Sequence, residues 1–321
     1  MKIDLFKSKI LLVRNDNIGD LICTTPSIEA LRKKYPSAQI DIVVNSYNFE
    51  AINNNKFVDK IYCYTKPKHK KGFLEKLKAG IGKLKILIDI KKEKYDAVIV
   101  LRSDYSKSAE LFSKITNAKY KVGVKNKRGK DDFNLYVDFD GNMNEVDFCY
   151  SCLNFFGVKK DYEKTTFYIP SNMINSHLKY YGYSAFHISA RMKNNQMSFN
   201  KLVDIVNSLP SDKFIITAEP KDYKIAKMIS KMCNIEFKKT ASFLDLGALF
   251  CNLKLLVTLE GGAMHLAPAV GLKTIALFGV SPLERWFPWG YKELVIQDKS
   301  LIAENIDKNL IISKIKENID D

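Results

Sequence analysis

The sequence lacks the long apolar runs that mark a membrane-spanning protein. Hydrophobic residues make up 46% of the 321 residues, but no run approaches the roughly 18 apolar residues that a spanning helix needs. Residues 1–7 place an acid and a lysine inside any apolar segment, so we expect no signal peptide and a cytoplasmic location. The length predicts two domains of ordinary size, each with its own core.

Cysteine and histidine are too sparse for a metal centre or a disulfide framework. The chain has six cysteines and four histidines, and only Cys149 and Cys152 have a metal-type spacing. A zinc site needs further ligands at set spacing, and no second pair follows. This pair is typical of small core residues on a helix. Asp138 and Asp140 are expected to share one face of a strand rather than bind metal, so we predict no metal site and no cofactor.

Acidic residues are in the minority, and the formal net charge is +15. Such a charge suits nucleic acid, an anionic membrane surface or an acidic substrate. No RNA-binding signature or zinc finger accompanies it, so we favour an anionic, lipid-linked partner near a phospholipid surface over nucleic acid. The absence of a G-x-G-x-x-G after the first strand and of a Walker A motif argues against dinucleotide oxidoreductases and NTPases.

Apolar strands alternate with amphipathic helices through both halves of the chain. This order predicts an α/β protein with two Rossmann-like domains that face each other across a cleft. Ile169-Pro170 interrupts the alternation, so we place the domains at 1–172 and 173–300, with a final helix in 301–321. The expected strands are 10–13, 40–44, 95–101 and 120–124, then 185–189, 213–217, 253–257 and 274–278.

The segment 66–94 is strongly basic and has apolar residues at helical spacing. Five of these share one face of the expected helix: Phe73, Leu77, Ile81, Leu84 and Ile88. A basic amphipathic helix more commonly packs on its own sheet, but it can also lie on a membrane surface. Both interpretations stay open, and both can be partly true.

Residues 253–278 predict a strand, a glycine turn, a short helix and a second strand. Gly261 and Gly262 open the helix, where bare backbone can approach a ligand and free N–H groups can bind an anion. Glu260 and His265 flank the turn, and the arrangement suits a diphosphate. The alternative is a plain turn whose glycines serve only tight packing.

A second turn of this kind follows the first expected strand. The strand ends at Val13, a polar loop follows, and Gly19-Asp20 leads into an expected helix over 21–34. Pro26 would then fall in the first turn or two of that helix, where proline is tolerated. Asp20 is a candidate general base. The competing interpretation makes it the N-cap of the helix.

Both turns resemble those of glycosyltransferase family 9, the heptosyltransferases of lipopolysaccharide core assembly. That family carries a basic residue, a loop and Gly-Asp in the first turn, which Arg14 and Gly19-Asp20 match. In the second turn it carries Asp-Thr-Gly-Pro-Met-His-Leu-Ala, and residues 260–267 read Glu-Gly-Gly-Ala-Met-His-Leu-Ala. The family's Leu-Phe-Gly-Pro-Thr corresponds to Leu277-Phe278-Gly279-Val280-Ser281. The resemblance runs in order over nearly the whole chain.

The resemblance implies an inverting, metal-independent glycosyltransferase of the GT-B type, with Asp20 as general base. It would move a heptose or a related sugar from an ADP-sugar to a lipid A–core acceptor, in peripheral contact with the inner membrane. The final helix would return to pack on the first domain. Donor-binding residues would be Arg191, Lys193, Asp222, Glu260, Gly261, Gly262, Ala263, Met264 and His265. Acceptor-binding residues would be Arg14, Asn17, Gly19, Arg102, Asp104, Lys125, Lys127 and Arg128.

The chain departs from the family pattern at a cation. The family has Lys-x-Trp-Pro after the first strand of the second domain, where this chain reads Asn195-Gln196-Met197-Ser198. Arg191 or Lys193 could supply the charge, and arginine binds phosphate with two donors. Asp222 resembles the acidic residue that contacts the donor ribose in the family, and Glu219 is the alternative for this role. A transferase for another sugar or surface glycan, and a non-catalytic protein that binds nucleotide sugars or anionic glycans, remain alternatives.

Overall fold

The computed structural model describes residues 3–66, 72–160, 164–209 and 213–319. The chain divides into two compact units, 1–163 and 164–321. The division lies before the expected boundary at 172 because residues 167–169 already pack on the second unit. There the Phe167 N–H donates to the Ala269 carbonyl at 3.1 Å.

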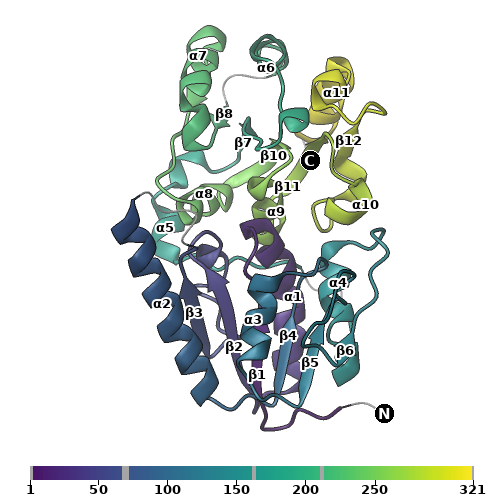
Figure 1. Cartoon of the computed structure of the whole chain (residues 1–321). Helices are drawn as coiled ribbons and strands as arrows, with labels where there is room; N and C mark the ends of the chain where they lie inside the picture. Colours follow the sequence, from purple (N-terminus) through teal and green to yellow (C-terminus); the bar gives the residue numbers. More distant parts are fainter. Residues whose placement is uncertain (1–2, 67–71, 161–163, 210–212, 320–321) are drawn as a thin grey trace. The chain divides into compact units, whose positions relative to one another are not determined.

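The first unit is a six-stranded parallel sheet in the order β3-β2-β1-β4-β5-β6 (Figure 1). Strand β1 lies between β2 and β4, so the strand order reverses at β1. The elements are β1 Lys9–Val13, α1 Ile18–Lys34, β2 Gln39–Asn45, β3 Lys60–Tyr64, α2 Phe73–Lys92, β4 Ala97–Val100, α3 Lys107–Lys114, β5 Tyr120–Gly123, β6 Leu135–Tyr136 and α4 Glu145–Ser151.

The second unit repeats this plan with the order β12-β11-β10-β7-β8-β9, again parallel. Strand β10 lies between β11 and β7. The elements are α5 Ser171–Asn175, β7 Tyr183–His187, α6 Phe199–Val206, β8 Phe214–Thr217, α7 Tyr223–Cys233, β9 Glu236–Phe237, α8 Phe243–Phe250, β10 Leu253–Leu259, α9 Gly262–Ala269, β11 Lys273–Phe278, α10 Leu283–Trp286, β12 Val295–Gln297 and α11 Lys308–Ile319.

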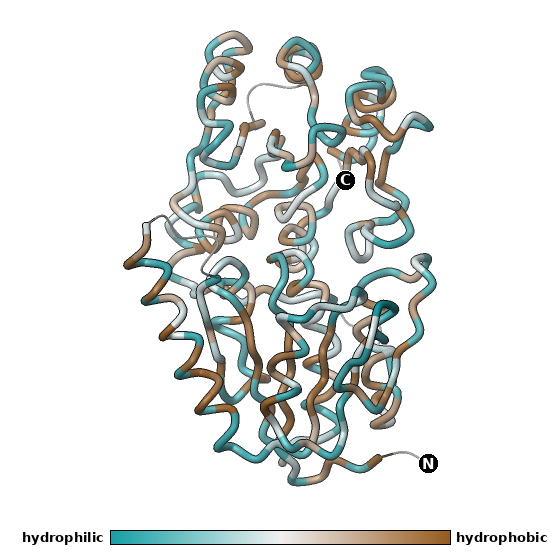
Figure 2. The backbone as a smooth tube through the Cα atoms, in the orientation of Figure 1, coloured by the Kyte–Doolittle hydropathy of each residue, from teal (hydrophilic) through white to brown (hydrophobic). Residues whose placement is uncertain are grey.

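The central strands are buried on both faces, which explains their continuous apolar sequences. Residues 10–13 of β1 and all of β4 are buried, and the middle of the first sheet is brown in Figure 2. The predicted α/β class with two Rossmann-like units is confirmed. In such sheets, ligands bind beyond the carboxyl ends of the strands, where the strand order reverses. The ends of β1 and β10 are therefore the expected ligand positions.

Helix α1 begins at Ile18 and not at Leu21, because Asn17 is the extended residue that precedes it. Pro26 consequently lies in the helix interior, and the expectation that it falls near the helix start was wrong. A proline leaves the carbonyl four residues earlier without its usual donor. The Thr25 hydroxyl fills that place by donating to the Ile22 carbonyl at 2.8 Å. Asp20 lies inside the first turn and is not the N-cap.

The C-terminal helix α11 packs within the second unit, against α6 and β10. Ile311 and Ile315 are buried in the core of that unit. The expectation that this helix returns to the first domain stays a prediction. Its apolar face is already covered by elements of its own unit.

Helix α2 has the predicted apolar stripe, but the stripe does not face the sheet. Phe73, Leu77, Ile81, Leu84 and Ile88 are all exposed. The helix packs on the first unit through another set of residues, with Ile90 buried and Ile86 and Leu87 partly buried. Residues 67–71 of the basic segment lie outside the described part of the chain. No described helix is both long and apolar enough to cross a membrane.

Candidate functional site

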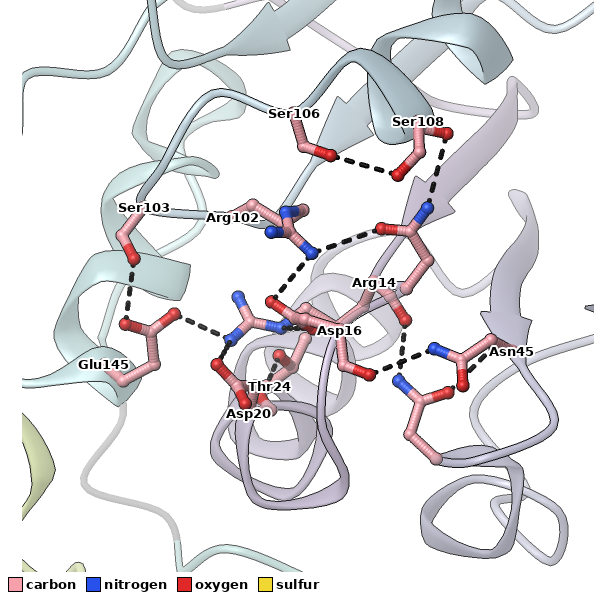
Figure 3. A network of polar contacts seen from close by, with 12 residues as sticks. Arg14, Asp16, Asp20, Thr24, Asn45, Arg102, Ser103, Ser106, Ser108 and Glu145 are labelled. Carbon is pink, nitrogen blue, oxygen red and sulfur yellow. Dashed lines mark hydrogen bonds and ion pairs between the residues drawn. The ribbon is translucent and has the colours of Figure 1, made fainter. Parts of the chain in front are cut away.

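Arg14 stands directly after β1, at the carboxyl end of the central strand of the first sheet. Its backbone N–H extends the sheet by donating to the Val43 carbonyl at 3.0 Å. Its side chain is fully buried, although a guanidinium is costly to bury without partners. The surrounding polar side chains supply those partners (Figure 3).

Three carboxylates surround the Arg14 guanidinium. Nε lies 3.0 Å from Asp16 Oδ1, and Nη2 lies 3.1 Å from Asp20 Oδ1. The same Nη2 donates to Glu145 Oε1 at 2.7 Å. Burial lowers the pKa of Arg14, but Asp16, Glu145 and Asp20 outweigh it and raise that pKa well above its ordinary value. Arg14 therefore stays charged and holds all three carboxylates in place.

Further polar contacts fix the orientation of this cluster. The Ser103 hydroxyl donates to Glu145 Oε2 at 3.2 Å, and Arg102 Nη1 lies 3.3 Å from Asp16 Oδ2. Glu145 is the first residue of α4, whose N-cap Asn144 accepts a hydrogen bond from the Val146 N–H at 2.9 Å. The capped start of α4 thus places Glu145 near the end of β1, although the two are far apart in the sequence.

The cluster contains three carboxylates but two guanidinium groups, and its acids compete for charge. Burial, together with the charges of Asp20 and Glu145, raises the pKa of Asp16 to about 6, against the opposing effect of Arg14 and Arg102. A raised carboxyl pKa of this kind is common at functional sites. The cluster is therefore sensitive to pH in a range where isolated aspartates are already ionised.

Asp20 combines restraint with access. Its side chain is 14% exposed and that of Asp16 is 13% exposed, whereas those of Arg14 and Glu145 are 0% and 1% exposed. The Thr24 hydroxyl donates to the Asp20 carbonyl at 2.9 Å and braces the first turn of α1. Gly19, directly before it, is buried. Asp20 can thus present a fixed carboxylate to a ligand.

The remaining predicted acceptor residues fall into separate groups. Arg102 belongs to the Arg14 cluster, and Asn17 and Asp104 are exposed on the loops that flank it. Arg14 is too deeply buried to contact an acceptor directly, so the prediction of such a contact is corrected. Its guanidinium is engaged by carboxylates instead.

The loop after β5, which holds the predicted acceptor residues Lys125, Lys127 and Arg128, contributes to a cleft of about 750 Å³ within the first unit. Arg128 lines this cleft, while Lys125 and Lys127 are exposed on the same loop and are not among its lining residues. Sequence reasoning missed Lys107 and Lys114, which are separated by two turns of α3 and lie on one face of it. The lining residues are Tyr105, Lys107, Glu110, Leu111, Lys114, Asn126, Arg128, Gly129 and Lys130.

In the second unit the predicted strand, glycine turn and helix are present as β10, 260–261 and α9. Gly262 is the first residue of α9, and Gly261 before it has an extended backbone. Ala263 and Met264 are buried, and Met264 packs against Ala276 and Phe278. These two side chains serve the core, so only their backbone can face a ligand.

His265 is also largely buried, and its ring meets Trp286 edge-on with centroids 6.0 Å apart. Glu260 lies at the carboxyl end of β10 and accepts a hydrogen bond from the Ser281 hydroxyl, which follows β11. Burial raises the pKa of Glu260, and the hydrogen bond from Ser281 opposes that shift. The turn thus joins the ends of two adjacent strands.

The loop that lacks the family lysine braces this turn. The Asn195 side chain is buried and its Oδ1 accepts from the Val280 N–H at 2.9 Å. A Cβ atom on Gly279 would lie 2.2 Å from the Asn194 carbonyl oxygen, so the two loops pack in direct contact. Arg191 and Lys193, the predicted replacements for the lysine, are exposed on this loop.

A different cation reaches the carboxyl end of β7. Lys221 Nζ donates to the Ala190 carbonyl at 2.7 Å and lies 3.6 Å from Glu219 and 4.0 Å from Asp222. Ser189, beside Ala190, places its carbonyl 3.9 Å from the Cβ position of Gly261. Sequence analysis did not consider Lys221. Its place just past β8, a neighbour of β7 in the sheet, was the available signal.

Within the described ranges, no group of three or more histidine, cysteine, aspartate or glutamate side chains is placed to hold a metal ion. The acids that do gather, around Arg14, are paired with Arg14 and Arg102. Cys149 and Cys152 are fully buried, as core residues are expected to be.

The raised pKa of Asp16 makes stability depend on pH. An unfolded aspartate has a pKa of about 3.9, so between about pH 4 and pH 6 the folded chain retains a proton that the unfolded chain has released. The contribution of Asp16 to the free energy of unfolding therefore falls as pH rises through this window. Chemical denaturation should show wild type losing stability relative to Asp16→Asn between about pH 4 and pH 7.

The exposed Asp138→Asn substitution serves as the control, because it removes an acid outside the cluster. The raised pKa would be contradicted if the difference in the free energy of unfolding between wild type and Asp16→Asn stayed constant with pH.

Known proteins resemble this chain in sequence and in fold. The sequence model of glycosyltransferase family 9 (heptosyltransferase) matches residues 84–310. Lipopolysaccharide heptosyltransferase 3 of Escherichia coli is 23% identical over 291 residues, which cover 84% of this chain and 83% of the relative.

Solved structures share the fold at lower sequence identity. A glycosyltransferase family 9 protein from Veillonella parvula DSM 2008 superposes with a TM-score of 0.81 at 16% identity, covering 99% of both chains. E. coli heptosyltransferase WaaC, solved with ADP-2-deoxy-2-fluoro heptose, has a TM-score of 0.78 at 16% identity and covers 97% of this chain and 99% of its own. The predicted GT-B type of fold is confirmed. The chain belongs to glycosyltransferase family 9, the heptosyltransferase family, and is a glycosyltransferase.

Proposed function

We propose that this protein transfers a heptose, or a closely related sugar, from an ADP-sugar to a lipopolysaccharide core acceptor, with inversion and without a metal ion. The observation that carries the proposal is Asp20, a partly accessible carboxylate fixed by buried Arg14 at the end of β1. Support comes from the similar E. coli enzyme named for lipopolysaccharide heptose transfer. WaaC, which has the same fold, was solved with ADP and with an ADP-heptose analogue.

In the proposed reaction, the acceptor hydroxyl attacks the anomeric carbon of the donor sugar. The hydroxyl proton passes to the Asp20 carboxylate as the new carbon–oxygen bond forms, and the bond to the diphosphate breaks. ADP leaves with the electron pair of that bond. A single displacement inverts the configuration at the anomeric carbon. Arg14 acts through Asp20, because it holds one carboxylate oxygen and leaves the group aimed from the first turn of α1.

The second unit would bind the donor diphosphate at the glycine turn after β10. The N–H groups at the start of α9 can donate hydrogen bonds to the diphosphate there, and Gly261 and Gly262 allow close approach. We assign to Lys221 the cationic role of the missing family lysine, because it already reaches the carboxyl end of β7 beside this turn. Asp222 or Glu219 would contact the donor ribose.

The first unit would bind the acceptor. The cleft between α3 and the loop after β5 presents four cations, Lys107, Lys114, Arg128 and Lys130, and the carboxylate of Glu110. Tyr105 and Lys114 both contact that carboxylate. Core acceptors carry phosphates and carboxylates, so the cleft has the charge to hold them. Such an acceptor is lipid-linked, and we propose that the reaction takes place at the cytoplasmic face of the inner membrane.

The proposal predicts that Asp20→Asn lowers turnover by a factor on the order of 100 to 10,000, the usual range for loss of a general base. Binding of ADP should be nearly unchanged, because Asp20 belongs to the first unit. Mass spectrometry of a heptose-deficient core incubated with ADP-heptose would measure the added sugar. Asp138→Asn is the matched control. Wild-type turnover in Asp20→Asn would remove Asp20 from the mechanism, and ADP binding with no transfer by wild type would favour a non-catalytic binding protein.

The donor assignment predicts that Lys221→Ala weakens ADP binding about 10- to 100-fold, as expected for loss of a charge-assisted hydrogen bond. Lys193→Ala is the matched variant, since both lysines are exposed and lie near the same loop. Titration calorimetry with ADP would compare them. A loss confined to Lys193→Ala, with Lys221→Ala binding normally, would contradict the assignment.

The acceptor assignment predicts that Lys107→Gln combined with Arg128→Gln raises the acceptor KM by about tenfold or more at low salt, because two charge-assisted contacts are lost. The effect should shrink as salt screens the remaining charges. The matched control, Lys125→Gln with Lys127→Gln, removes the same charge from exposed positions that do not line the cleft. Equal effects of the two pairs would mean that overall charge, and not the cleft, attracts the acceptor.

A further inference from the structure

Helix α2 is apolar on two sides. The side that meets the first unit contains Ile90, which is fully buried, and Ile86 and Leu87, which are partly buried. At 3.6 residues per turn, the stripe of Phe73, Leu77, Ile81, Leu84 and Ile88 points almost directly away from Ile86 and Ile90. The stripe therefore cannot serve the core of its own unit.

The outward stripe is large and continuous. Its five members and the adjacent Leu74 are each between 46% and 80% exposed. They follow one another over about four turns of the helix, and α2 shows repeated brown segments among teal ones along the edge of the first unit in Figure 2. Soluble proteins seldom leave a continuous apolar surface of this kind uncovered.

Lysines border the stripe. Helix α2 carries six lysines and two acidic residues. Helical spacing places Lys78, Lys85 and Lys92 along one edge, and Lys76 along the other. Lys83 instead lies over the rings of Tyr64 and Phe112, at 5.2 and 5.6 Å from their centroids, on the side of the helix that meets the unit. Positive charge is thus concentrated around the exposed apolar surface.

We propose that α2 lies flat in the interface of an anionic phospholipid membrane. Its apolar stripe would enter the boundary of the acyl chains, and the bordering lysines would contact lipid phosphates. The positive charge of α2 favours an anionic membrane over a second copy of the chain, because a second copy would bring another lysine-rich helix against the first. The inference rests on the proposed function only for which membrane is involved; the lipid contact itself requires no sugar transfer.

Vesicle co-sedimentation of the full chain tests this proposal. Vesicles of phosphatidylglycerol and phosphatidylethanolamine should bind wild type, and vesicles of phosphatidylcholine should bind it much less. The combination Leu77→Gln, Ile81→Gln and Leu84→Gln should weaken binding by about tenfold or more, because three apolar side chains no longer enter the bilayer. Lys78→Gln with Lys85→Gln should weaken binding to the anionic vesicles by about fivefold for each lysine.

The matched control is Met228→Gln, Met232→Gln and Leu310→Gln. These residues are 51% to 62% exposed on α7 and α11, so the control removes apolar surface elsewhere and should bind vesicles like wild type. Circular dichroism and thermal unfolding establish that each variant is folded. Wild-type vesicle binding by the α2 triple variant would overturn the proposal. The proposal would also be overturned if wild type did not bind vesicles but formed a dimer in sedimentation velocity, and the triple variant were monomeric.

Activity with two acceptors separates this proposal from the proposed function. The α2 triple variant should transfer sugar normally to a lipid-free core oligosaccharide and poorly to an acceptor embedded in anionic vesicles. Equal losses with both acceptors would overturn the membrane role of α2. If wild type transfers sugar to neither acceptor, the proposed function fails, while the vesicle-binding arms still decide the role of α2.

Discussion

The first unit depends on one buried charge, the guanidinium of Arg14. It stands where the order of the parallel sheet reverses, and it carries no exposed surface. Burial of such a group is tolerable only with well-placed partners. The contacts with Asp16, Asp20 and Glu145 therefore decide the conformation of the loop after β1, the start of α1 and the position of α4. Loss of one carboxylate would leave Arg14 incompletely paired.

The second unit uses packing where the first uses charge. The turns after β7, β10 and β11 hold one another through Asn195, Gly279 and the hydrogen bond between Ser281 and Glu260. Asn195 and its neighbours stand where the family pattern has a lysine-containing stretch. The loop braces the glycine turn, and the proposed cation comes from Lys221 on the adjacent strand end.

Sequence alone predicted the parts of the site that depend on local order. The two apolar strands that the sequence predicted before glycine-containing turns are present as β1 and β10. Asp20 and Glu260-Gly261-Gly262 follow them as predicted. Glu145 was missed because it meets Arg14 across 131 positions, and only the order of the strands brings them together. Lys221 was missed for the same reason. The periodicity of α2 identified its apolar stripe but could not tell which side faced the sheet, since Ile86 and Ile90 offer a second apolar side.

The central claim is that Arg14 contributes to catalysis through Asp20. A double-mutant cycle on kcat, with Arg14→Lys and Asp20→Asn made singly and together, tests it most directly. Lysine keeps the buried charge but cannot reach three carboxylates as a guanidinium does. If the claim is right, the double variant is about as slow as Asp20→Asn alone, because Arg14 has no further role once the base is gone. If the two losses multiply in a double variant that remains folded, Arg14 acts independently of Asp20 and the claim is wrong.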